Sequence, residues 1–264
     1  MLLRSFYLVL LLCFVQCERI KRVIGGIPVN YDMFPAAVYI SREGQHICGG
    51  TRIQDIVLTA AHCVINSLPE KLLVQQRKYE NGSSIILPVK QIISHNFNRR
   101  TNANDIAILY VGVEDIRHKS KVEFFPLPIK LPLKKYRAKG ACFVSGPGVR
   151  NIYGDVEPDV GRLYAALMEV VPPWRCRNAL GQYLAPPRNS GLFCAGTGIQ
   201  DTCQGDSGSA LLCLDTKHAS WILAGIVSYG INCGVNGLPG VFTDVSYHIN
   251  WINRHTYALR YKYL

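Results

Sequence analysis

Short runs of β-branched and aromatic residues recur along most of the chain, and glycine, proline, asparagine or charged residues separate them. Runs of this kind are typical of the strands of an all-β sandwich or barrel. The clearest runs span residues 36–40, 55–59, 84–93, 106–111, 141–144, 211–214, 221–229 and 240–245. Helical periodicity is scarce except in the tail from Val245 to Leu259, which has Ser246 as a candidate cap. The sequence therefore predicts a mostly β fold with a C-terminal helix.

The N-terminus carries the only strongly apolar run, from Phe6 to Val15, with Arg4 before it and Glu18 after it. A bilayer-spanning helix needs roughly 20 apolar residues, so this run is too short to span. Its layout is that of a secretory signal peptide, and a buried N-terminal strand fits the flanking residues less well. We expect residues 1–17 to be the signal peptide and the mature chain to be secreted, extracellular and free of a membrane span.

The composition excludes several classes of protein. With 264 residues, 48% of them hydrophobic and 18% charged, the chain is suited to a folded globular domain and not to disorder or a coiled coil. The formal net charge of +11 favours polyanions weakly, but no zinc-finger spacing or aromatic RNA-binding signature accompanies it, so we expect no nucleic-acid partner. The basic stretch Phe125–Lys139 is interpreted as a solvated connector between two halves; an anion-binding exosite is the alternative.

Ten cysteines occur, and Cys13 and Cys17 fall in or beside the signal. The remaining eight form an even number in an exported chain, which predicts disulfides. No CxxC pair is present to begin a zinc site, so we expect no metal and no cofactor. Eight cysteines allow 105 pairings, and the residues alone leave the connectivity open.

Three separated motifs carry potential chemistry. Gly205-Asp206-Ser207-Gly208 places a serine between glycines, where the backbone can approach a reacting carbonyl. Thr59-Ala60-Ala61-His62-Cys63 and Asn104-Asp105-Ile106-Ala107 place a histidine and an acid beside apolar runs. Either residue alone is more often structural, but a nucleophilic serine needs a base, and the base needs an orienting acid.

In this order, TAAHC, DIAI and GDSG resemble the motifs of the chymotrypsin-like (trypsin-type) serine endopeptidase family, and the likeness extends from Val23 to about Trp251. The resemblance implies an all-β fold of two six-stranded antiparallel β-barrels, with the active site between them and a C-terminal helix. It implies that Ser207 is the nucleophile, His62 the base and Asp105 the acid. The backbone N–H groups of Gly205 and Ser207 would form the oxyanion hole.

The same resemblance assigns the primary substrate pocket. Asp201, six residues before Ser207, matches the acid at the base of a trypsin-type pocket, and Gly230 and Gly240 match its wall glycines. A carboxylate there would pair with the Arg or Lys that precedes the cleaved bond. Ser228 matches the serine that hydrogen-bonds the catalytic acid and borders the pocket.

Arg22-Val23-Ile24-Gly25-Gly26 resembles the activation site of the family. Cleavage after Arg22 would free the amino group of Val23 to pair with Asp206, and would leave residues 18–22 as a short propeptide before a protease domain at residues 23–264. Because Arg19-Ile20-Lys21-Arg22 also fits a dibasic convertase pattern, the activating protease is either a proprotein convertase or a trypsin-like enzyme.

By the same resemblance, the disulfides would join Cys48 to Cys63, Cys142 to Cys213, Cys176 to Cys194, and Cys203 to Cys233. The chain departs from the family pattern at Pro147, Ser209 and Tyr229, near the cleft. A side chain at Ser209 would strain the backbone if the position required glycine. The stretch Leu73–Ile86 contains a single acid, so we expect no calcium there. Asn81 begins a glycosylation sequon, or else an ordinary Asn-Gly turn.

Taken together, these features predict a secreted serine endopeptidase, made as a zymogen, that cleaves after Arg or Lys. Its expected partners are protein or peptide substrates, an activating protease and proteinaceous inhibitors, and the expected state is a monomer. The alternative is a catalytically silent homologue that acts as a binding or regulatory protein.

Overall fold

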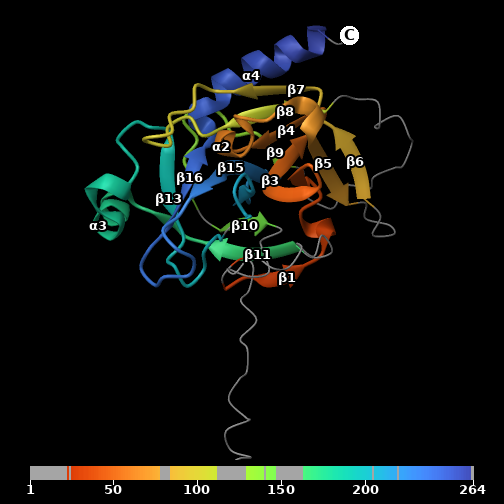
Figure 1. Cartoon of the computed structure of the whole chain (residues 1–264). Helices are drawn as coiled ribbons and strands as arrows, with labels where there is room; N and C mark the ends of the chain where they lie inside the picture. The colour runs from red at the N-terminus through yellow and green to blue at the C-terminus, as the bar shows by residue number, and fades with distance from the viewer. Residues whose placement is uncertain are drawn as a thin grey trace, which may run out of the picture.

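The structure is a computed structural model that describes residues 23, 25–77, 84–111, 129–139, 141–146, 163–203, 205–218 and 220–262. Two curled sheets make up most of it, and α4 lies across one end (Figure 1). The predicted signal peptide and propeptide, Asn81 and Pro147 lie outside the described residues.

The first sheet is built from the N-terminal half of the chain and is antiparallel throughout. Its spatial order is β6-β5-β2-β3-β4-β8-β7. The strands are β2 (Ala37–Arg42), β3 (Gln45–Ile53), β4 (Ile56–Thr59), β5 (Leu72–Arg77), β6 (Ser84–Pro88), β7 (Gln91–Ser94) and β8 (Ala107–Tyr110). The run 84–93, expected as one strand, forms two strands, β6 and β7, which pair with β5 and β8. The first of them ends at Pro88, because proline has no N–H to donate to a sheet.

The second sheet is built from β1 and the C-terminal half, in the order β1-β11-β10-β14-β15-β16-β13-β12, with β9 parallel to β15. Its strands are β1 (Ile27–Val29), β9 (Ile129–Lys130), β10 (Cys142–Gly146), β11 (Leu163–Met168), β12 (Val170–Val171), β13 (Leu192–Ala195), β14 (Ala210–Asp215), β15 (Ser220–Tyr229) and β16 (Gly240–Asp244). The two-barrel architecture is confirmed. Within the described residues the sheets have seven and nine strands, more than six each. The first has seven because the run 84–93 forms two strands, and the second has nine because the short strands β1, β9 and β12 also pair with it.

The helices are α2 (Ala61–Val64), α3 (Pro173–Leu184) and α4 (Val245–Lys262), with short 3-10 turns at Tyr31–Met33 and Pro69–Lys71. The predicted C-terminal helix is confirmed as α4, but its cap differs. The carboxylate of Asp244 accepts the N–H groups of Ser246 and Tyr247 at 2.8 and 3.3 Å, while the Ser246 hydroxyl donates to Tyr136 O. An acid at this position satisfies the free N–H groups of the first turn.

The largest core cluster joins the two halves. Val38, Leu58 and Ile108 of the first sheet belong to the same buried cluster as Leu212 and Ile226 of the second, and α4 adds Val245, Ile249, Ile252 and Leu259. Tyr257, which shares the helical spacing of the tail, is instead exposed. Because apolar burial drives folding, this shared cluster fixes how the two sheets meet.

The four disulfides pair as the resemblance implied: Cys48 with Cys63, Cys142 with Cys213, Cys176 with Cys194, and Cys203 with Cys233. The described part of the connector, residues 129–139, contains β9, and its lysines and arginine are exposed. In residues 129–139, strand pairing of β9 therefore fixes the start of the segment, and the charged side chains lie in solvent.

Candidate active site

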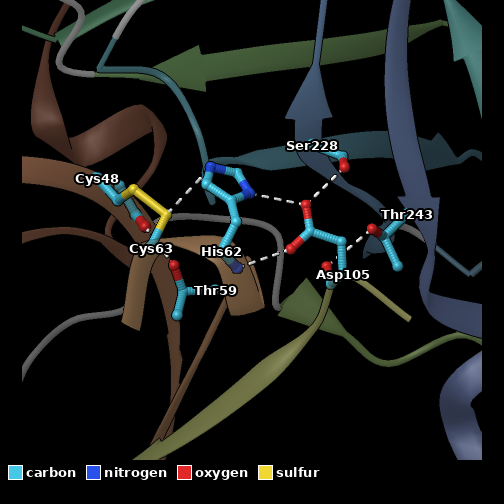
Figure 2. Close-up of polar contacts among 8 residues, drawn as sticks. Cys48, Thr59, His62, Cys63, Asp105, Ser228 and Thr243 are labelled. Atoms are coloured by element: carbon cyan, nitrogen blue, oxygen red, sulfur yellow. Dashed lines mark hydrogen bonds and ion pairs between the residues drawn. A yellow bond between two sulfur atoms is a disulfide. The ribbon is translucent and has the colours of Figure 1, made fainter. Parts of the chain in front are cut away.

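A buried carboxylate lies where the two sheets meet. Asp105 follows the first-sheet loop before β8, and its side chain is 1% exposed. Its Oδ1 accepts the backbone N–H of His62 at 2.9 Å, and its Oδ2 accepts from His62 Nδ1 at 2.7 Å and from the Ser228 hydroxyl at 2.6 Å (Figure 2). Thr243 also donates to the Asp105 carbonyl at 2.8 Å. A buried carboxylate is tolerated when it is hydrogen-bonded in this way.

These contacts define the protonation of the His62 ring. A carboxylate oxygen accepts the hydrogen bond here, so Nδ1–H is the donor to Asp105 and Nε2 is the ring nitrogen left to face away from it. His62 sits on α2, and its side chain is 34% exposed although Ala60, Ala61 and Cys63 around it are buried. The ring is therefore partly open to solvent on a rigid support, with Nε2 on the side away from Asp105, 3.6 Å from Cys63 Sγ.

The segment with Ser207 lies between the sheets. Its carbonyl accepts the N–H of Gly49 on β3 at 2.8 Å, and the next residue, Gly208, donates to Val227 O on β15 at 2.9 Å. A side chain at Gly208 would collide with Thr59 and with the Gly49 carbonyl, immediately before α2. Ser207 is thus held beside the segment that carries His62.

Among the hydrogen bonds of the described residues, none joins the Ser207 hydroxyl to His62. The atom in contact with His62 Nε2 is instead Cys63 Sγ, at 3.6 Å (Figure 2). Bonds between a nucleophile and its base are often loose until substrate is bound. The structure therefore joins His62, Asp105 and Ser228 directly and brings Ser207 near them without that last bond.

Ser209 departs from the family pattern without strain. The residue is buried, and its φ is outside the left-handed region. Its hydroxyl occupies the space over Gly49, where any side chain on Gly49 would overlap it. Gly49 on β3 leaves room for the Ser209 hydroxyl. The backbone strain that a required glycine would have caused at Ser209 is therefore absent.

Asp201 lies in a second buried acidic environment. The residue is 3% exposed, and its carboxylate accepts the N–H groups of Thr202 at 2.8 Å and Gly234 at 3.1 Å. Burial raises the pKa of Asp201 to about 6, and the two backbone hydrogen bonds oppose this rise. No cationic side chain pairs with it among the described residues.

Gly240 lies against Asp201. A Cβ built on Gly240 would approach Asp201 Oδ1 to 3.3 Å, and one on Gly230 would meet only Asn232 O, at 3.8 Å. Tyr229, beside Gly230, donates its hydroxyl to Leu184 O at 3.0 Å, and burial raises the pKa of Tyr229 to about 12. Gly240 therefore lies beside the acid, and the side chain of Tyr229, which precedes Gly230, is anchored to α3.

Val23 and Asp206 are both fully buried. Val23 packs in the core cluster that contains Val144 of β10, while Asp206 Oδ2 accepts the N–H of Cys203 at 2.9 Å. Asp206 Oδ1 lies against Gly146, at the end of the same strand. The two residues thus approach β10 from different parts of the chain.

Sequence reasoning missed several residues that support this region. His46 Nε2 donates to Gly205 O at 3.1 Å, Thr59 donates to Gly49 O at 2.8 Å, and Thr243 supports Asp105. His46 and Gly205 are 159 residues apart, so no local pattern could join them. The contacts of His46 and Thr243 come from the docking of the two sheets, whereas that of Thr59 lies within the first sheet.

One cluster offers three potential metal-ligand atoms, from Cys48, His62 and Cys63. The two cysteines are joined in a disulfide, and only a free thiolate is a good ligand, so the cluster does not fit a metal. In the described part of the chain, no helix combines the length and the apolar character that crossing a bilayer requires. Four disulfides are typical of proteins in an oxidising compartment.

Comparison with known proteins decides the family, because a sequence model of the trypsin family matches residues 23–252. The chain belongs to the trypsin family. It is 33% identical to trypsin epsilon of Drosophila erecta over 237 residues, 88% of this chain and 87% of that protein. It is 30% identical to trypsin I-P1 of Gallus gallus over 243 residues, 90% of each.

The family also includes larger proteins. Transmembrane protease serine 7 of Mus musculus is 31% identical over 257 residues, which cover 94% of this chain but 30% of that protein. Family membership makes the protein a trypsin-like serine endopeptidase, a peptide hydrolase.

Proposed function

We propose that this protein is a secreted, zymogen-derived endopeptidase that cleaves peptide bonds after Arg or Lys. The observation that carries the specificity is the buried carboxylate of Asp201, which has two backbone partners and lies against Gly240, where the absence of a side chain leaves space. An arginine guanidinium entering that space would meet the carboxylate in a low-dielectric environment, where the attraction is strong. A lysine ammonium would pair with it as a point charge.

In the proposed reaction, Ser207 Oγ attacks the carbonyl carbon of the substrate as His62 Nε2 takes its proton. Asp105 keeps the proton on Nδ1 and stabilises the imidazolium that forms. His62 then returns the proton to the leaving amine. Water attacks the acyl-enzyme in the same way, with His62 as the base, and releases Ser207. The bond from Ser228 and the backbone N–H of His62 keep Asp105 oriented throughout.

The backbone N–H groups of Gly205 and Ser207 are proposed to stabilise the oxyanion. Gly205 has a φ of 88°, which favours glycine, and its carbonyl is held by His46. A preorganised donor of this type contributes roughly 10²–10³ in turnover.

Activation is proposed to follow cleavage between Arg22 and Val23. The burial of Val23 and Asp206, which both lie near β10, supports an ion pair between the new amino group and the carboxylate. A buried carboxylate without a cation is costly, so the pair would favour the ordered oxyanion loop. N-terminal sequencing of the mature protein should begin at Val23, and a different start would exclude this assignment.

Cleaving the purified zymogen at Arg22 and assaying chromogenic amides that end in Arg, Lys, Phe or Ala tests the proposal. We expect hydrolysis after Arg and Lys, none by Ser207→Ala, and loss of the basic preference in Asp201→Ser. A correctly processed protein that neither turns over substrate nor reacts with a fluorophosphonate would instead be a silent homologue. Hydrolysis after Phe or Ala with equal efficiency would refute the role of Asp201.

A further inference from the structure

The loop between β7 and β8 is held in one shape by its own asparagines. Asn98 Oδ1 accepts the N–H groups of Arg100 at 2.9 Å and Thr101 at 3.2 Å, and the Asn98 N–H donates to Ala103 O at 3.0 Å. Three further asparagines have positive φ values, 39° at residue 96, 54° at 102 and 58° at 104. Asparagine tolerates this region better than most residues, so the sequence is suited to this compact loop.

This loop presents two adjacent arginines, Arg99 and Arg100, both exposed. Arg99 Nη2 donates to Asn66 Oδ1 at 2.9 Å, and Asn66 follows α2, the helix that carries His62. The loop ends at Asp105, the buried partner of His62. The Arg99 guanidinium is therefore held beside the helix that carries His62, and the exposed Arg100 follows it in the same loop.

Neither arginine forms an ion pair with an acid among the described residues. Asp105, the next acid along the chain, is buried and hydrogen-bonded to His62 and Ser228. Two uncompensated cations in the same loop produce a local positive potential that attracts anionic groups.

The geometry also indicates which part of a substrate passes this loop. Ser228 contacts Asp105, and further along the same segment the N–H of Gly234 donates to the pocket acid Asp201 at 3.1 Å, so residues 228–234 connect the two acids. A peptide whose basic side chain enters that pocket can run back along residues 228–230, on the Asp105 side of His62. The Cys48–Cys63 disulfide lies at the other end of the His62 ring (Figure 2).

We propose that Arg99 and Arg100 make this endopeptidase select substrates with Asp or Glu within the few residues that precede the cleaved Arg or Lys. The proposal rests on the proposed function. The guanidinium groups would pair with the substrate carboxylates, and Arg99 would do so with the side chain already positioned by Asn66.

The test compares kcat/KM for peptide amides that end in Arg and differ only in Glu or Gln at the second, third or fourth position before the cleaved bond. We expect the activated protein to prefer Glu at one or more positions, and Arg99→Ala and Arg100→Ala each to reduce the Glu/Gln ratio about two- to fivefold at low salt. Arg100→Glu should reverse the preference at the affected position. High salt should weaken the preference, because exposed charges are screened.

Arg137→Ala is the matched control, since Arg137 is exposed on the connector, next to Tyr136 at the base of α4, and should leave the ratio unchanged. Arg100→Ala keeps the backbone bond to Asn98, so it tests charge without removing a loop contact. Equal rates for the Glu and Gln peptides, or a ratio unaffected by both arginine variants, would overturn the inference while the endopeptidase function stands. No hydrolysis of any peptide would refute the function itself, and the inference with it.

Discussion

Protonation of Asp201 should control how tightly the primary pocket binds a cation. The residue is 3% exposed, and burial raises the pKa of its carboxyl to about 6 in the unliganded protein. A bound amidinium would stabilise the carboxylate and lower that pKa again. At pH 5, one unit below this pKa, roughly a tenth of the molecules would be ionised, so benzamidine should bind about tenfold more weakly than at pH 8.

Isothermal titration calorimetry in two buffers of different ionisation enthalpy measures both the affinity and the protons released. The His62→Ala variant removes the titration of the active-site imidazole from this signal. Near pH 6 we expect about half a proton to be released per benzamidine bound, because half of the unliganded carboxyls are protonated there. Affinity that stays constant from pH 5 to pH 8, or that survives in Asp201→Ser, would refute the reasoning.

Three further predictions concern stability and turnover. His248 is buried, neither ring nitrogen has a hydrogen-bond partner among the described residues, and burial lowers its pKa to about 4, so the unfolded chain binds the proton more tightly. The contribution of His248 to stability should be full above about pH 6.5 and fall by about 3 kcal/mol by pH 4, measured as the difference in urea denaturation between the protein and a His248→Asn variant, because the raised pKa of Asp201 shifts the total in the opposite direction. Ser228→Ala should lower kcat about tenfold in steady-state assays, because the Asp105 carboxylate loses a charge-assisted bond. Replacing Cys203 and Cys233 by Ala should cost about 2–5 kcal/mol in the same denaturation assay.

The strands were predictable from the sequence where apolar residues gather in short runs between turn residues, and α4 was predictable because its buried residues recur at helical spacing. Helix α3 was missed for a physical reason. Within it, only Cys176 and Leu180 are buried, it begins after Pro172, and Gly181 interrupts it with non-helical angles. A helix with so narrow a buried face leaves little periodicity to detect.

The residues of the candidate site also divide into those that the sequence predicts and those that only the structure reveals. His62, Asp105 and Ser207 stand in recognisable local motifs, so their identities could be read from the sequence. The residues that support the site could not be predicted, because Thr243 and His46 are ordinary strand residues whose contacts form only when the two sheets pack together. Their contacts are tertiary, and no local composition encodes them.

Asp105 explains why such a site forms only in the complete fold. His62 contacts it from the first sheet, whereas Ser228 and Thr243 contact it from the second, across sequence separations of 123 and 138 residues. If either sheet were absent, the carboxylate would lose partners and its burial would become unfavourable. The orientation of the His62 ring is therefore coupled to the docking of the two sheets, and a variant that loosens this docking should lose activity before it loses secondary structure.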